Sequence, residues 1–448
     1  MTDSVNLRSV ALDIILEVNE NKQFTHVVLN NALTKYQYLD KNKRAFITRL
    51  TTGTIEANLE MDYIINQFSK TPVKKMKPVI KNILRMSVYQ LIYMDSVPDS
   101  AVCNEAVKLA SKRGFTGLKG FVNGVLRNIA RNKDNIEYPD KEKDILSYLS
   151  VKYSIDRWIL DMWKKNYSDE EIADILSGIR KDKKTYIRCN TLKAKQQDIR
   201  EMLEKEGVKV NAVKDIPYAY EISDFDYLNG LETFKNGYFQ VQDISSMMAG
   251  EEASPKADDF CIDVCAAPGG KSINAALKMH EAADLNNKEK VTGKIISRDI
   301  SDYKTDMIRD NIDRLGIDNI CVEEWNALDF DKENEEKADI VIADLPCSGL
   351  GIMGRKPDIK YNLSEEKIME LAKLQKDILS VVHRYVKPGG ILVYSTCTIS
   401  SEENEKNADW LCENYGFEKC HEYKQILPGS NNDSDGFFIA KLRRTGDR

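Results

Sequence analysis

The run Ile262-Asp263-Val264-Cys265-Ala266-Ala267-Pro268-Gly269-Gly270-Lys271-Ser272 decides the fold of the second half of this 448-residue chain. It begins as an apolar strand, and its small residues lead into a helical pattern. Small residues let the backbone approach a ligand, and a helix N-terminus offers free N–H donors. A triphosphate loop would need glycine where Cys265 stands, and the nicotinamide pattern G-x-G-x-x-G is absent. The loop therefore predicts a nucleoside ligand.

Strands and helices alternate on both sides of this loop, from about residue 240 onward. The expected strands are 259–264, 294–299, 319–323, 339–343 and 390–396, and helical stretches lie near 270–282, 302–315, 365–386 and 402–415. This alternation predicts an α/β, doubly wound, mostly parallel sheet with right-handed crossovers. We expect the last strand, 436–442, to close one edge of the sheet in the antiparallel direction.

The first 130 residues carry helical periodicity throughout, and a polar, proline-containing stretch at 132–145 follows as a linker. Between about 146 and 235, short helices mix with strand-like pieces such as 185–188 and 208–213, which predicts a small α+β (RRM-like) part. The predicted organisation is therefore multidomain: an all-α domain at 1–140, a small domain at 141–235, and the doubly wound domain at 236–448.

Composition and charge limit the function classes. No apolar run approaches the roughly 18 residues of a membrane span, and the first residues lack a secretory signal, so a cytoplasmic protein without membrane contact is expected. Four histidines without metal-ligand spacing, and nine cysteines without a C-x-x-C pair, predict neither metal nor disulfide framework. The net charge is +6 over residues 1–140 and −12 over 236–448. A basic N-terminal part beside an acidic second half fits an RNA-docking module.

Two cysteines stand just beyond expected strands: Cys347 in Ala-Asp-Leu-Pro-Cys-Ser and Cys397 in Tyr-Ser-Thr-Cys-Thr. Ligands of open α/β sheets bind beyond the carboxyl ends of the strands. Two thiols there favour covalent attack plus a second proton-handling group over two buried cysteines that only fill space. Asp299 ends the next strand, where an acid can grip ribose hydroxyls, and Asn326 follows the third strand, where its amide can bond adenine.

These motifs together resemble the S-adenosylmethionine-dependent RNA cytosine-C5 methyltransferases. The stretches that carry the resemblance are 263–272, Asp344-Leu345-Pro346-Cys347-Ser348, Arg355-Lys356-Pro357-Asp358, Ser395-Thr396-Cys397, Asp435-Gly436-Phe437-Phe438, and upstream Arg188–Lys193 and Gln242-Asp243. The helical stretches 104–107 and 121–127 resemble the NusB antitermination fold. A NusB-like domain joined to a class I, Rossmann-like methyltransferase domain is the layout of the bacterial 16S rRNA enzymes of the Sun or Fmu type.

The resemblance implies a cofactor, S-adenosyl-L-methionine, and a set of residues that bind it. These are Cys265, Ala266, Ala267, Pro268, Gly269, Gly270 and Lys271 in the loop, with Asp299 on the ribose, Asn326 near the adenine, and Asp344 lining the site. The chain departs from the family in two details: Asn326 stands where an acid is common, and Leu345 replaces the usual alanine.

The resemblance also implies roles in catalysis. Carbon 5 of cytosine is a poor nucleophile until a thiolate adds at carbon 6, and a proton must leave carbon 5 before the thiol departs. Cys397 would be the nucleophile, Cys347 would assist elimination or release, and Asp344 would contact N3 and the exocyclic amine. Lys271 would orient Asp344 or lower a thiol pKa, unless it is an ordinary solvated lysine.

The implied partner is 16S rRNA, naked or in an early ribosomal particle, bound by a protein for which nothing demands more than a monomer. Arg188, Asn190, Arg355 and Lys356 are the expected RNA contacts. Three alternatives stay open: the same chemistry on tRNA or 23S rRNA, an inactive RNA-binding assembly factor, and a DNA cytosine-C5 enzyme with Cys347 as nucleophile. The retained thiols argue against the second, and the Thr-Cys motif with the basic helical part argues against the third.

Overall fold

The computed structural model describes residues 5–285, 290–430 and 433–446. Its internal contacts form two compact units: Met1–Ala173 with Arg355–Asn362, and Asp174–Gly354 with Leu363–Arg448. The short stretch 355–362 thus leaves the second unit and folds as part of the first. No helix in the described ranges is both long and apolar enough to cross a membrane.

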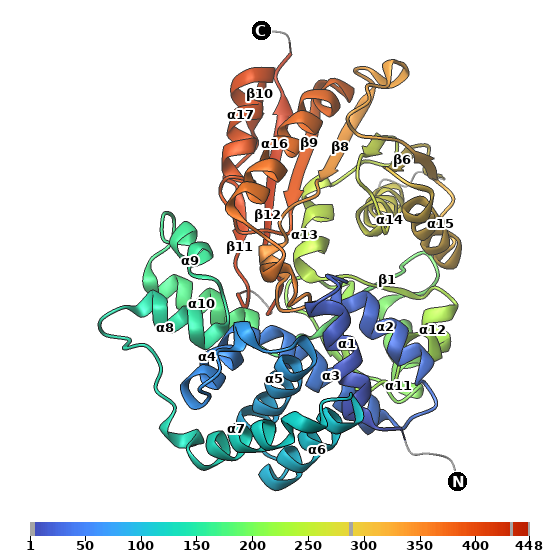
Figure 1. Ribbon diagram of the computed structural model, residues 1–448. Coiled ribbons are helices and arrows are strands. Elements are labelled where there is room, and N and C mark those ends of the chain that lie inside the picture. Colours follow the sequence, from blue (N-terminus) through green and yellow to red (C-terminus); the bar gives the residue numbers. More distant parts are fainter. Residues whose placement is uncertain (1–4, 286–289, 431–432, 447–448) are drawn as a thin grey trace. The chain divides into compact units, whose positions relative to one another are not determined.

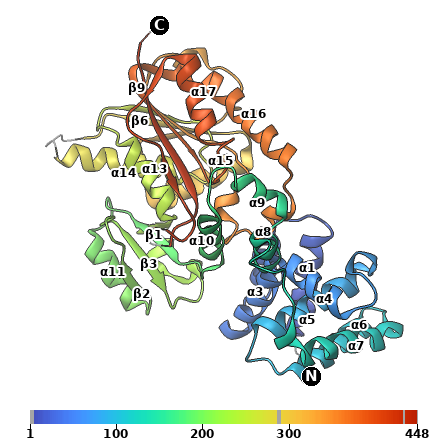
Figure 2. The same cartoon turned by 90° about the vertical axis from the view of Figure 1, so that its left-hand side faces the viewer.

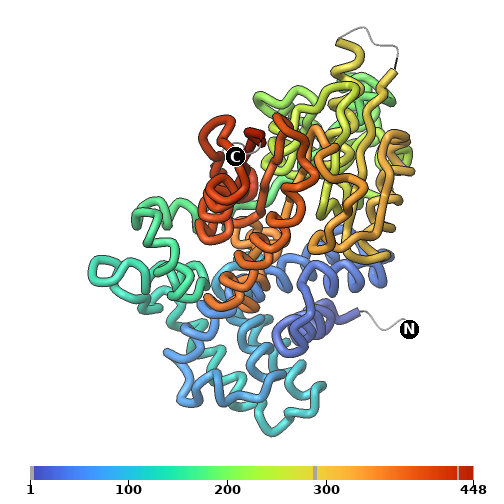
Figure 3. The backbone as a smooth tube through the Cα atoms, turned by 90° about the horizontal axis from the view of Figure 1, so that it is seen from above, coloured from blue at the N-terminus to red at the C-terminus, as the bar shows by residue number. Residues whose placement is uncertain are grey.

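The first unit is built from helices, drawn in blue to green in Figures 1 and 3. They are α1 (Leu7–Asn19), α2 (Thr25–Lys35), α3 (Lys41–Glu56), α4 (Asn58–Phe68), α5 (Pro78–Tyr93), α6 (Asp99–Lys112), α7 (Lys119–Arg131), α8 (Ile145–Tyr153) and α9 (Arg157–Trp163), and α10 (Asp169–Arg180) spans the division between the units. The Asn6 side chain caps α1, and Pro78 begins α5 where its missing N–H costs nothing. One continuous apolar core joins α1 and α3–α7, which confirms the predicted all-helical part.

The second unit begins with a four-stranded antiparallel sheet in the order β2-β3-β1-β4. Its elements are β1 (Thr185–Cys189), α11 (Gln196–Lys205), β2 (Lys209–Ala212), β3 (Ala219–Ser223), α12 (Glu232–Lys235) and β4 (Phe239–Val241). Figure 2 shows α11 on one face of this sheet. This β-α-β-β-α-β sequence confirms the predicted small α+β domain. The predicted small domain ends at residue 235, but β4 follows α12 and pairs with β1, so this sheet continues to residue 241. The domain boundaries at 140 and 235 stay a prediction.

An eight-stranded sheet forms the rest of the second unit, in the order β10-β12-β9-β8-β5-β6-β7, with β11 paired to β12. The strands are β5 (Phe260–Asp263), β6 (Lys294–Asp299), β7 (Ile320–Glu324), β8 (Ala338–Asp344), β9 (Val386–Thr396), β10 (Phe417–Lys419), β11 (Lys424–Ile426) and β12 (Phe437–Arg444). Strands β5 to β9 run parallel, and β12 runs antiparallel to β9. The prediction that the last strand lies at the edge is wrong, because β10 and β11 pair with its outer side.

Helices cover both faces of this sheet, as Figure 2 shows. They are α13 (Ile244–Ala253), α14 (Gly270–Leu285) and α15 (Asp302–Leu315) on one face, and α16 (Glu365–Val382) and α17 (Glu405–Tyr415) on the other. Each layer has its own apolar core. The doubly wound prediction is therefore confirmed, and the strands that carry the cysteines lie side by side with Asp344 opposite Ser395.

Candidate active site

The glycine-rich loop joins β5 to α14 and crosses the end of β6. The Ala266 N–H donates to the carbonyl of Arg298 at 2.8 Å, and the Ala267 N–H donates to the Asp299 carboxylate at 2.9 Å. Gly269 has φ +95°, a conformation that favours glycine. Asp299 is almost fully buried and also accepts from the Lys304 ammonium at 2.9 Å. This carboxylate therefore anchors the loop, and its contact with a ribose stays a prediction.

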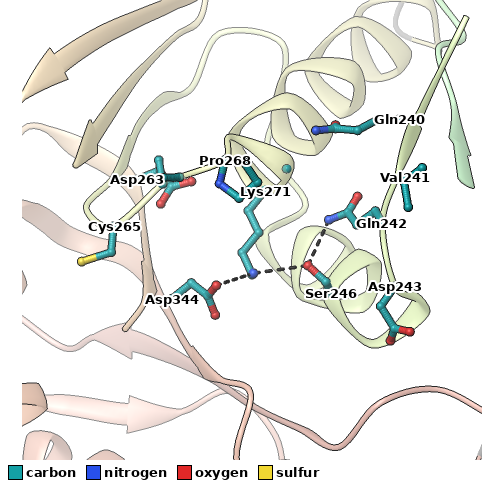
Figure 4. A pocket seen from close by; sticks show the side chains of 13 residues that line it. Gln240, Val241, Gln242, Asp243, Ser246, Asp263, Cys265, Pro268, Lys271 and Asp344 are labelled. Atoms are coloured by element: carbon teal, nitrogen blue, oxygen red, sulfur yellow. Dashed lines mark hydrogen bonds and ion pairs between the residues drawn. The ribbon is translucent and has the colours of Figure 1, made fainter. Parts of the chain in front are cut away.

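A cavity of about 220 Å³ lies beside the loop. Its walls come from the loop, from β4 and the start of α13, and from the ends of β5 and β8 (Figure 4). The lining residues are Gln240, Val241, Gln242, Asp243, Ser246, Asp263, Cys265, Ala266, Ala267, Pro268, Gly270, Lys271 and Asp344. Residues 240–246 were not predicted to line the site; the resemblance of Gln242-Asp243 to an upstream signature was the available signal. Ligand pockets usually measure roughly 300–1,000 Å³. The cavity therefore suits one end of a nucleoside cofactor.

The residues around this cavity fit a charged, hydrogen-bonding ligand. Asp263 is fully buried, and while its Oδ2 accepts from Ser272 at 2.6 Å, its Oδ1 has no hydrogen-bond partner among the residues that the structure describes. Burial raises the pKa of Asp263 to about 7. A Cβ added at Gly270 would lie 3.4 Å from the Gln242 side-chain nitrogen, an ordinary van der Waals distance, so the start of α14 packs close to Gln242. An orphaned buried acceptor is the kind of group that a ligand N–H or O–H satisfies.

Lys271 joins the cavity to the strand ends. Its ammonium lies 2.5 Å from Asp344 Oδ2 and 3.3 Å from the Ser246 hydroxyl, as the dashed lines of Figure 4 show. The other oxygen of Asp344 accepts from the Ser395 hydroxyl at 2.7 Å. Lys271 is only 9% exposed. It is thus no solvated lysine; it fixes the Asp344 carboxylate from the first turn of α14, while Ser395 fixes it from β9.

The two thiols lie against each other at the ends of β8 and β9. Cys347 Sγ is 3.1 Å from Cys397 Sγ, and the Cys397 N–H also donates to Cys347 Sγ at 3.2 Å. Both residues are half-buried. The hydrogen bond with Cys397, together with burial, raises the pKa of Cys347 well above its ordinary value. Cys347 therefore keeps its proton and can share it with the neighbouring sulfur.

Two of the predicted RNA contacts are buried inside the second unit. Arg188 is 2% exposed and donates to Gln242 at 2.5 Å, to Gln240 at 2.8 Å and to the carbonyl of Gly270 at 2.8 Å. Asn190 is 1% exposed and donates to the carbonyls of Gly237 at 2.9 Å and Leu315 at 2.8 Å.

The prediction that these two side chains contact RNA is therefore wrong, because the end of central strand β1 and the residue that follows it turn both side chains inward. There they tie the small sheet to the N-terminus of α14 and the C-terminus of α15.

The other predicted contacts lie on accessible segments. Arg355 is exposed and Lys356 half-buried at the start of the stretch that belongs to the first unit. That stretch is held by Lys360 and Tyr361, which both donate to the carbonyl of Glu56, at 2.7 and 2.9 Å. Asn326 is half-buried, and its side-chain oxygen accepts from the Leu328 N–H at 3.1 Å. RNA contact by the first two and adenine contact by Asn326 stay predictions.

Comparisons with known proteins agree with this geometry. Family models match three stretches: the NusB family at 5–131, an RsmF/B-like ferredoxin-like domain at 155–225, and the 16S rRNA methyltransferase RsmB/F at 252–443. The probable ribosomal RNA small subunit methyltransferase B of Bacillus subtilis is 32% identical over 459 residues, covering 98% of this chain and 99% of that protein.

Two solved structures are also similar. The crystal structure of PH0851 covers 98% of this chain and 99% of its own, with TM-score 0.79 and 26% identity. The structure of NSun6 from Pyrococcus horikoshii with SFG covers 64% of this chain and 97% of its own, with TM-score 0.57 and 24% identity, a likeness of fold. The resemblance predicted from the motifs is confirmed. The chain belongs to the ribosomal RNA small subunit methyltransferase B family of S-adenosylmethionine-dependent methyltransferases.

Proposed function

We propose that the protein methylates carbon 5 of a cytosine in 16S rRNA through a covalent bond between Cys397 and carbon 6 of the base. One observation carries the proposal: two thiols 3.1 Å apart at the ends of neighbouring parallel strands, beside a carboxylate fixed by Lys271 and Ser395. A methyltransferase that acts on a base nitrogen or a ribose oxygen has no need of a sulfur nucleophile.

The cofactor loop, the orphaned Asp263 oxygen and Lys271 would hold S-adenosylmethionine. When bound, this cofactor supplies an electrophilic methyl group. The chain's own residues must then place the base and make its carbon 5 nucleophilic. Asp344 would bond N3 and the exocyclic amine of cytosine, and a group held from both sides reorganises little during reaction.

The two thiols have different roles: Cys397 forms the bond to the base, and Cys347 assists the breaking of that bond. Cys347 keeps its proton because the bond to Cys397 and burial raise its pKa, which favours Cys397 as the thiolate that adds to carbon 6. After transfer, the carbon 5 proton leaves to solvent and the carbon 6–sulfur bond breaks. The Cys347 S–H lies 3.1 Å from the departing sulfur and would stabilise it as a thiolate by hydrogen bonding.

The substrate must present an unpaired or extruded base, because the site lies beyond the sheet edge and a stacked base would not reach the sulfur. The basic first unit is the proposed docking element for ribosomal RNA, free or in a particle, in the cytoplasm. Arg355 and Lys356, at the start of the stretch that folds with this unit, are the proposed phosphate contacts.

The test compares Cys397→Ala with Cys347→Ala, using labelled cofactor and transcribed 16S rRNA. We expect Cys397→Ala to lose both methylation and the covalent protein–RNA adduct, and Cys347→Ala to accumulate the adduct. Cys321→Ala, which changes an exposed cysteine on β7, is the matched control and should behave as the unmodified protein does.

Two outcomes would contradict the proposal. Loss of the adduct in Cys347→Ala alone would reverse the two roles, and methyl transfer without any adduct would exclude covalent catalysis. Parallel reactions with tRNA and 23S rRNA, followed by bisulfite mapping of the products, test the choice of RNA.

A further inference from the structure

A buried carboxylate holds the turn that carries Cys347. Glu403, between β9 and α17, is fully buried. Its Oε1 accepts from the Ser348 backbone N–H at 2.7 Å, and its Oε2 accepts from the Ser348 hydroxyl at 2.6 Å. Both oxygens of one carboxylate therefore bind the residue that directly follows Cys347.

Gln375 of α16 holds the other side of the same turn. Its side-chain amide donates to the carbonyl of Pro346 at 2.9 Å and to Glu403 Oε1 at 3.3 Å. Gln375 is itself buried and accepts from the Asn407 amide at 2.8 Å. The residues before and after Cys347 are thus fixed by one buried network, which leaves the sulfur little freedom to move away from its partner.

The neighbouring residue performs the same task for the other cysteine. Asn404 accepts from the Thr396 hydroxyl at 2.5 Å and donates to the carbonyl of Thr398 at 3.1 Å. The hydroxyls of Ser348 and Thr398 are also hydrogen-bonded to each other at 2.8 Å. Two consecutive side chains, one acid and one amide, therefore set the relative position of the two sulfurs.

Burying a carboxylate at this position costs desolvation free energy, which a purely structural role does not explain. Burial raises the pKa of Glu403. Its carboxylate accepts hydrogen bonds from neutral groups, the Ser348 N–H and hydroxyl and the Gln375 amide. An ionised group without a cation partner pays a desolvation cost that an amide or apolar residue would avoid. What the carboxylate adds is two acceptor oxygens in a fixed plane, which match the two Ser348 donors.

We infer that Glu403 is a positioning residue for product release: it holds Ser348, and through it the Cys347 thiol, against the sulfur of Cys397. The inference rests on the proposed function, in which Cys347 assists departure of Cys397 from the methylated base. Glu403 is fully buried and bonds Ser348, so its assigned role acts through the Cys347 turn and not by contact with base or cofactor. Its loss should therefore slow release far more than methyl transfer, since a displacement of about 1 Å can cost 100-fold in a geometry-dependent step.

The experiment measures methyl transfer and adduct decay separately in single-turnover reactions of the full chain with 16S rRNA and labelled cofactor. Glu403→Ala is expected to transfer methyl within about threefold of the unmodified rate and to release the adduct on the order of 100-fold more slowly. Glu403→Gln, which keeps the shape and one of the two acceptor oxygens, should release the adduct at a rate between those of Glu403→Ala and the unmodified protein. Glu402→Ala, at the neighbouring residue that pairs with Lys406, is the matched control.

Release at the unmodified rate in Glu403→Ala would overturn the inference. An equal loss of methyl transfer and release would also overturn it, because that pattern belongs to a general scaffold residue. Should Glu403→Ala not fold, as judged by its melting curve, Ser348→Ala carries the test by removing one of the two bonds: slower release supports the inference and unchanged release contradicts it. If Cys347→Ala forms no adduct either, the proposed function has failed and not only this inference.

Discussion

The ends of strands β8 and β9 and the end of strand β1 both carry inward-facing polar side chains, but the two regions use them differently. At β8 and β9, the Cys347 and Cys397 sulfurs face each other beside Asp344, which lines a cavity. At β1, Arg188 and Asn190 donate to amide oxygens and backbone carbonyls that tie the small sheet to α14 and α15. The difference teaches that burial alone does not mark a reactive site. The reactive side chains lie beside a cavity that a ligand can enter, whereas the structural side chains use their hydrogen bonds to join two parts of the protein. Changes in the first region should therefore cost activity, and changes in the second should cost stability.

Among the substitutions that test this comparison, Asp344→Asn should have the largest effect. An amide cannot pair with Lys271 as the carboxylate does and binds cytosine less well, so turnover should fall by roughly 100- to 1,000-fold. Urea denaturation should show a free energy of unfolding within about 1 kcal/mol of the unmodified value. A large loss of stability with little loss of activity would place Asp344 with the structural residues.

The next effect concerns pH and Asp263. Burial raises the pKa of this carboxyl from 3.8 to about 7 in the folded protein. The folded state then binds the proton more tightly than the unfolded state, so this group's contribution to stability is greatest at low pH. That contribution is lost as pH rises from about 4 to about 7. The amide of Asp263→Asn does not titrate. The free energy of unfolding of this variant, minus that of the unmodified protein, should therefore rise by about 3 kcal/mol as the pH is raised from 5 to 7.5.

Urea titrations of both proteins across that range measure the effect. A difference in unfolding free energy that stays constant with pH would contradict the raised pKa. A difference in unfolding free energy that falls as the pH rises would mean that a cation stabilises the ionised Asp263 carboxylate.

A smaller change is expected for Arg188→Ala. The substitution leaves two glutamine oxygens and the Gly270 carbonyl without their donor, which should lower the free energy of unfolding by about 2 kcal/mol. RNA affinity, measured on folded protein by filter binding, should keep its salt dependence. A weakened salt dependence with unchanged stability would restore Arg188 as an RNA contact.

The smallest effect belongs to Lys356→Ala. If this lysine neutralises one phosphate, the slope of log affinity against log salt should fall by about 1 and the affinity by a few-fold, with an unchanged melting temperature. Lys367→Ala, on helix α16, offers a comparison lysine in the second unit. An unchanged slope in Lys356→Ala would remove it from the RNA-binding surface.

The sequence predicted what depends on periodicity and strand order. Residues after neighbouring parallel strands must meet at one sheet edge, so the sequence alone predicts that Cys347 and Cys397 lie together. The position of the last strand could not, because β10 and β11 are three-residue strands with little pattern, and they alone move β12 away from the edge.

The role of the basic motifs was harder to predict for a physical reason. Arginine and asparagine suit RNA and buried backbone carbonyls equally well, and only the tertiary partners decide between them. Arg188 binds buried protein groups, because its guanidinium donates to Gln240, Gln242 and the carbonyl of Gly270. The stretch 355–362 is a second example of a tertiary contact that local sequence patterns do not predict. Its Lys360 is buried and donates to the Glu56 carbonyl of the first unit.

The measurement that tests the central claim most directly uses RNA that carries 5-fluorocytidine. Fluorine at carbon 5 cannot leave as a proton does, so a protein that attacks carbon 6 and transfers the methyl group stays bonded to the base. Digestion and mass spectrometry then identify the modified peptide. The account predicts the bond on the peptide that contains Cys397; a bond on the peptide that contains Cys347, or methylated RNA without any bonded peptide, would contradict it.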